Sequence, residues 1–165
     1  MFDCKLGTVV KIRGFKGEIV VETRFKNTEM FRTVTKYKID DTVYKTVDFK
    51  NLGNRAGLLL NGITTDVMAK KFIGKTVFYS KDEVNYGDKL FLEDMLDFML
   101  VDEDGKSYGI LDSIENYGAG DLLVVINNDK EIYLPERKGF ITGYDKEKHV
   151  IFVDKKLIGE VLYED

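Results

Sequence analysis

The sequence predicts a mainly all-β protein built from two small units in tandem. Its apolar residues fall in short runs rich in Val, Ile, Leu and aromatic residues, which is typical of buried strands rather than helices. Gly, Asn and Asp separate these runs, and such residues form tight turns. The charge balance also changes along the chain: residues 1–87 hold 16 Lys and Arg against 10 Asp and Glu, whereas residues 88–165 hold 9 against 19.

The first half begins with two strands joined by a glycine loop. β-branched residues alternate with other residues at 6–12 and recur at 19–23, which predicts a strand pair. The loop between them, residues 13–18, contains two glycines and two cations. The same criteria predict four more strands, at residues 33–39, 44–50, 56–60 and 75–79. The strands at 33–39 and 44–50 carry lysines on one expected face.

A short helix is predicted in this half, at about residues 65–73. Thr64 and Thr65 are suitable N-caps, and Asp66 favours the positive end of the helix dipole. Gly74 is a natural helix end. A polar stretch at residues 80–88 follows the next strand, so we expect two domains, 1–86 and 87–165.

The second half reads as short strands separated by turns. It opens with an apolar stretch at 90–101 and ends with an amphipathic tail at 157–163. The strands expected between them are residues 109–114, 122–126, 131–134, 140–142 and 150–153. Turns are expected at 102–105, 117–121 and 127–130, and Pro135 should close its strand. Short strands joined by tight turns are typical of a small antiparallel barrel or sandwich.

The sequence offers little for catalysis or metal binding. Cys4 is the single cysteine and lies in an N-terminal segment that we expect to fray; it excludes an internal disulfide. His149 is the single histidine, expected at the edge of a hairpin with no nucleophile beside it. The acidic turn at 102–104 lacks the spacing of a calcium loop and should be solvated. We therefore expect no enzyme, cofactor or metal site.

Composition favours a reduced cytoplasmic protein. No apolar run approaches the roughly 18 residues of a membrane span, and the N-terminus lacks the pattern of a secretory signal. We expect a monomer. The uneven charge suggests different partners for the two halves, a polyanion for the first and a basic protein for the second. The alternative is that the charge pattern serves only solubility.

Several motifs in the same order resemble the RimM family of ribosome maturation factors. The segment 13–19 is similar to the family pattern H-G-L-R-G-E-V, with Arg13 in place of His and Phe15 in place of Leu. The Gly-Lys pair at 74–75 matches the G-K that follows the family's helix. Residues 117–125 resemble T-G-A-N-D-V-L-V-V, and Leu-Pro at 134–135 resembles the I-P that comes a hairpin later. The resemblance extends from residue 6 to about residue 153.

This resemblance implies a translation-factor-type barrel followed by a PRC-type barrel. It also implies a non-enzymatic assembly factor that binds the free small ribosomal subunit, assists late maturation of the subunit head, and aids processing of its rRNA. The second domain of the family contacts a basic head protein, ribosomal protein S-nineteen.

The resemblance also supplies candidate site residues. The family's docking motif Y-Y-W falls on Leu90, Phe91 and Leu92, so docking here would be apolar. With Tyr117, these are the expected ribosomal-protein contacts. Apart from the resemblance, the cations Arg13 and Lys16 of the glycine loop are candidate rRNA contacts, the alternative being that the glycines only shape a tight turn. The family-motif turn residues are Gly14, Gly17, Gly118 and Asp121.

Two other classes of function remain open from the residues alone. A PRC-type barrel can be a regulatory or adaptor module that binds a cofactor or a metabolic enzyme. A carboxylate pair, such as Asp94 with Asp121, would instead suggest an enzyme with a deep cleft and shifted pKa values.

Overall fold

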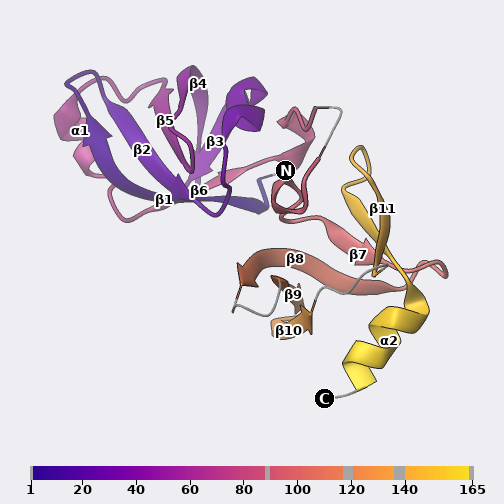
Figure 1. Ribbon diagram of the computed structural model, residues 1–165. Helices are drawn as coiled ribbons and strands as arrows, with labels where there is room; N and C mark the ends of the chain where they lie inside the picture. Colours follow the sequence, from indigo (N-terminus) through magenta and orange to yellow (C-terminus); the bar gives the residue numbers. More distant parts are fainter. Residues whose placement is uncertain (1, 88–89, 117–120, 136–139, 164–165) are drawn as a thin grey trace. The chain divides into compact units, whose positions relative to one another are not determined.

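The computed structural model describes residues 2–87, 90–116, 121–135 and 140–163. The chain divides into two compact units, residues 1–89 and 90–165, and both are built mainly from strands (Figure 1). The predicted all-β class is confirmed. Unit 1 has 17 Lys and Arg against 11 Asp and Glu, and unit 2 has 8 against 18.

Unit 1 is a closed barrel in the order β1-β2-β5-β4-β3-β6. Its six strands are β1 (Cys4–Arg13), β2 (Glu18–Thr23), β3 (Lys36–Ile39), β4 (Thr42–Asn51), β5 (Arg55–Leu60) and β6 (Thr76–Tyr79). The last strand closes the barrel because it pairs antiparallel with both β1 and β3. Closure leaves no exposed strand edge, which protects a small sheet from aggregation.

The predicted helix is present as α1 (Asp66–Lys70). The Thr65 side chain accepts a hydrogen bond from the Met68 backbone N at 3.2 Å, which is a standard N-cap. Turns continue the chain to Gly74, whose φ is +90°. The regular helix begins at the expected N-cap but is shorter than the predicted 65–73, because it ends at Lys70, before Gly74.

One strand begins later than predicted. Residues 33–39 were expected to be extended throughout, but a 3-10 helix, η1 (Glu29–Thr33), ends at Thr33 and β3 begins only at Lys36. Its Phe31 is fully buried and makes edge-to-face contacts with Phe25 at 4.9 Å and Tyr79 at 5.0 Å. Edge-to-face packing is a favoured aromatic geometry. The helical turn thus contributes a fully buried ring to the core of unit 1.

Unit 2 contains one six-stranded sheet in the order β10-β9-β8-β7-β12-β11. Its strands are β7 (Met99–Val101), β8 (Ser107–Asn116), β9 (Asp121–Asn127), β10 (Lys130–Pro135), β11 (Ile141–Asp145) and β12 (Val150–Val153). All pairings are antiparallel except β7 with β12, which is parallel. Short 3-10 turns precede the sheet at η2 (Lys81–Glu83) and η3 (Leu92–Asp94).

A helix that was not predicted ends the described chain. The tail expected at 157–163 belongs to α2 (Lys155–Tyr163), where Ile158 is fully buried. The Asp154 carboxylate accepts a hydrogen bond from the Leu157 backbone N at 3.1 Å, as an N-cap does. No helix within the described residues is both long and apolar enough to cross a bilayer.

The expected solvent exposure of three single residues was wrong, because all three are buried. Cys4 is not in a frayed tail but is buried in β1. His149 lies in the expected hairpin but is buried, and its ring meets Phe98 edge-to-face at 5.3 Å. Asp102 was expected in a solvated turn, yet only 3% of it is exposed. Its carboxylate accepts hydrogen bonds from the Tyr108 hydroxyl at 2.7 Å and from two backbone N–H groups.

Candidate nucleic-acid interface

The loop between β1 and β2 has a backbone that depends on glycine. Gly14 and Gly17 have φ values of +65° and +97°, in the region that L side chains rarely adopt. A Cβ at Gly17 would lie 2.3 Å from the Ile63 carbonyl oxygen, whereas a Cβ at Gly14 would meet nothing within 4 Å. Gly17 therefore lets the loop pack against the segment before α1, and this fixes the position of the loop.

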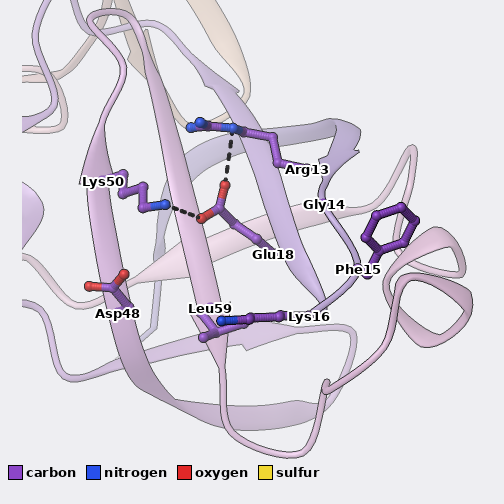
Figure 2. Close-up of a pocket in the computed structure, with 8 residues that line it drawn as sticks. All are labelled: Arg13, Gly14, Phe15, Lys16, Glu18, Asp48, Lys50 and Leu59. Atoms are coloured by element: carbon purple, nitrogen blue, oxygen red, sulfur yellow. Dashed lines mark ion pairs between the residues drawn. The ribbon is translucent and has the colours of Figure 1, made fainter.

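A carboxylate anchors the cations beside this loop. Glu18 is buried at the start of β2, and its two oxygens lie 3.4 Å from Arg13 Nε and 3.4 Å from Lys50 Nζ. Among the described residues the Oε2 atom has no hydrogen-bond partner, so its contact with Arg13 is an ion pair only. Figure 2 shows both cations converging on Glu18 from β1 and β4.

These residues line a groove of about 500 Å3. Its lining is Arg13, Gly14, Phe15, Lys16, Glu18, Asp48, Lys50 and Leu59. The groove combines cations, two carboxylates and apolar surface. Because Glu18 holds two of the three cations, less positive charge is available to a ligand than the residue count suggests.

The loop tip presents an aromatic ring and a cation to solvent. Phe15 is 83% exposed, and Figure 2 shows its ring on the far side of the loop from the Glu18 ion pairs. Lys16 is also exposed, and no ion pair of Lys16 occurs within the described residues. Sequence analysis proposed Arg13 and Lys16 as equivalent rRNA contacts. In the structure Arg13 forms an ion pair with Glu18, whereas no described acid forms an ion pair with Lys16.

The predicted docking residues of unit 2 differ from one another in exposure. Phe91 is 60% exposed, while Leu90 and Leu92 are half-buried. The Phe91 backbone N donates to the Asp94 carboxylate at 2.9 Å, which fixes the start of η3. Phe91 is thus an exposed ring on a locally ordered turn. Tyr117 and Gly118 lie outside the described residues, and Asp121 is the exposed first residue of β9.

One member of the carboxylate pair suggested for an enzyme has a local structural contact. Asp94 accepts the Phe91 backbone hydrogen bond, which is a structural role for this member of the suggested carboxylate pair. Within the described part of the chain, no cluster of three or more His, Cys, Asp and Glu residues is arranged to hold a metal ion.

The ion pairs of Glu18 were not predicted, because its partner Lys50 is distant in sequence. The only local indication of a charged cluster was the presence of Arg13 and Lys16 in the same loop.

Comparison with known proteins adds independent evidence. No protein-family model matches the chain. A ribosome maturation factor RimM from Thermosipho africanus is 30% identical over 152 residues, which cover 87% of this chain and 85% of that protein. The chain belongs to the RimM family. The RimM of Clostridioides difficile is 26% identical over 157 residues and covers 91% of each chain.

A solved RimM structure is also similar. The crystal structure of a 16S ribosomal RNA processing protein RimM from Pseudomonas aeruginosa aligns with a TM-score of 0.44 and 18% identity, over 91% of this chain and 95% of that one. The two RimM sequence alignments alone cover 87% and 91% of this chain, so the family assignment includes both units.

Proposed function

We propose that this RimM-family protein is a non-enzymatic ribosome assembly factor. In this proposal it binds the free small ribosomal subunit and assists late maturation of the subunit head and processing of its rRNA. The observation that carries the proposal is the alignment with RimM of Thermosipho africanus across 87% of the chain. The proposal implies a cytoplasmic protein that acts as a monomer.

Unit 1 is proposed to contact rRNA. It carries a charge excess of +6 from 17 cations and 11 acids, and RNA phosphates attract such a surface by counterion release. At the β1–β2 loop, Lys16 is the stronger candidate contact because no acid pairs with it in the described residues. Arg13 contributes less, since Glu18 already holds its guanidinium at 3.4 Å.

Unit 2 is proposed to contact the basic head protein, ribosomal protein S-nineteen. Its 18 acids against 8 cations favour a basic partner. Phe91 supplies an exposed apolar ring of the kind that anchors protein interfaces. Leu90 and Leu92 would contribute apolar area beside it, and Tyr117 is kept as a further candidate contact.

In this mechanism the factor acts only through its binding to the subunit head. A factor that binds an immature head more tightly than a mature one shifts the population toward the state it prefers. A tenfold difference in affinity corresponds to about 1.4 kcal/mol. No chemical step is required, so the proposal needs neither a nucleophile nor a metal.

Gradient sedimentation of the tagged protein with cell extract tests the proposal. We expect the protein in the free small-subunit fraction and not with whole ribosomes. Recovery of the protein only at the top of the gradient, at low salt as well as at physiological salt, would contradict a ribosomal role. The adaptor alternative predicts that result, together with binding to a cofactor or an enzyme.

A further inference from the structure

Four lysines lie on one outer face of the unit 1 barrel. Lys36 of β3 is directly opposite Lys45 of β4. One step along the same strand, Lys38 is opposite Val43 on one side and Phe78 of β6 on the other. Phe78 is in turn opposite Lys5 of β1. We call Lys5, Lys36, Lys38 and Lys45 the lysine face.

Burial shows that this face points outward. Tyr37 and Ile39, which alternate with the two β3 lysines, are 0% and 1% exposed. Side chains at alternate positions of a strand point to opposite sides of the sheet. Lys36 and Lys45 are therefore neighbours on the solvent side, where their Cβ atoms are about 5 Å apart.

The described acidic side chains do not form ion pairs with this face. No ion pair of these four lysines occurs within the described residues. Two acids close to β3 are engaged elsewhere: Asp40 pairs with Lys75, and Glu83 accepts hydrogen bonds from the Thr35 backbone N and hydroxyl. Like charges directly opposite in a sheet are destabilising. In the folded protein Lys36 and Lys45 therefore repel each other, and a bound polyanion would reduce this repulsion.

The pattern fits RNA phosphates better than RNA bases. Lys36 and Lys38 are two residues apart, or about 6.6 Å along the strand, and lysine ammonium groups bind phosphate as flexible point charges. Proteins that grip single strands stack bases on exposed rings. The apolar members of this face are an aliphatic Val43 and a Phe78 that is only partly exposed.

We infer that the lysine face binds the phosphate backbone of double-stranded rRNA without reading its sequence. Helical RNA is recognised mainly by shape and by contacts to phosphate and sugar. The inference deepens the proposed role of unit 1, because it names the surface and the form of RNA. The lysine face is distinct from the β1–β2 loop, which follows the C-terminal end of β1, whereas Lys5 lies near the start of that strand.

The first experiment measures binding of the full-length protein to a labelled RNA duplex by fluorescence anisotropy at several salt concentrations. The test variant is the double substitution K36Q/K45Q. Its matched control is K70Q/K71Q, which removes two exposed lysines at the end of α1. We expect the test variant to bind about tenfold more weakly and to lower the salt slope by about 2, because each lost phosphate contact lowers that slope by roughly 1.

The control should change affinity by less than about twofold, because it removes the same charge away from the face. Equal losses for the two variants would overturn the inference. So would tighter binding to single-stranded RNA of the same length, or tighter binding to poly-glutamate, which would indicate an acidic protein partner.

A second measurement separates binding from folding. Since Lys45 opposes Lys36, Lys45→Gln should raise the thermal midpoint by about 1–4 °C while it weakens duplex binding. A lowered midpoint would contradict the repulsion on which the inference rests. Failure of the proposed function looks different: the wild-type protein would bind duplex RNA but would not sediment with small subunits.

Discussion

Gly14 and Gly17 lie in the same loop, but only Gly17 packs against backbone. Gly17→Ala would place a Cβ 2.3 Å from the Ile63 carbonyl oxygen at a φ of +97°. We expect it to lower the free energy of unfolding by about 2–4 kcal/mol, from strain and overpacking. Gly14→Ala should cost only about 1 kcal/mol, because its Cβ would be in open space. Urea unfolding measures both, and similar losses would contradict the packing role of Gly17.

Asp102 and Tyr108 form a hydrogen-bonded pair whose contribution to stability depends on pH. The Tyr108 hydroxyl and backbone N–H groups hold the pKa of Asp102 below its ordinary 3.8. Burial, and then Asp102 itself, raises the pKa of Tyr108 to about 12. Because the folded pKa of the Asp102 carboxyl is depressed, its contribution is present above pH 3.8 and is lost as pH falls through the folded value.

Asp102→Asn should therefore lower the thermal midpoint at pH 7, and the difference from wild type should shrink below pH 3.8. The measurement is thermal unfolding at a series of pH values. Asp41→Asn, at an exposed position of the β3–β4 turn, is the control and should stay close to wild type throughout. A deficit that persists unchanged at the lowest pH would show that the carboxylate charge is not the cause.

For single residues, the sequence predicted backbone conformation better than it predicted burial and side-chain contacts. The glycine loop at 13–18 follows from residue types alone. The burial of Glu18 depends on Lys50, and that of Asp102 on Tyr108, so both require tertiary contacts. Phe91 was singled out by resemblance, and its exposure depends on how the chain folds around η3.

At the scale of elements, the β9–β10 hairpin shows how turn chemistry sets register. Asn128 and Asp129 have φ values of 49° and 69°, as in a type I′ turn. Since glycine adopts positive φ more readily than aspartate, Asp129→Gly should stabilise unit 2 by about 0.5–1 kcal/mol. Lys130→Gly, one residue later in β10, should instead destabilise it. Denaturant unfolding compares the two, and a loss for Asp129→Gly would argue against this turn.

The elements that sequence reasoning missed are those fixed by distant partners. The parallel pairing of β7 with β12 joins segments about fifty residues apart, and nothing local to 99–101 signals it. The tail at 157–163 was recognised as amphipathic but not as helical; its cap, Asp154, lies just outside that segment. Strands bounded by glycine or asparagine turns were predicted because their signals are local.

At the scale of the whole molecule, the change in charge near residue 87 indicated two units with different partners. The compact units found at 1–89 and 90–165 carry charge balances of +6 and −10. The charge of a segment depends only on its residues, so the order of the amino acids is enough to suggest this division. The faces that carry the charge cannot be predicted in the same way, because they depend on which strands pair and which side of each strand is buried.

The last prediction compares two exposed phenylalanines, one in each unit. Phe91 is 60% and Phe15 is 83% exposed, so replacing either with Ala should change the free energy of unfolding by no more than about 0.5–1 kcal/mol. Phe91→Ala should weaken binding to the isolated basic head protein by about tenfold or more, as loss of an aromatic anchor does. Phe15→Ala should leave that affinity unchanged. Titration calorimetry with the full-length variants measures both, and an equal loss from Phe15→Ala would refute the assignment of this partner to unit 2.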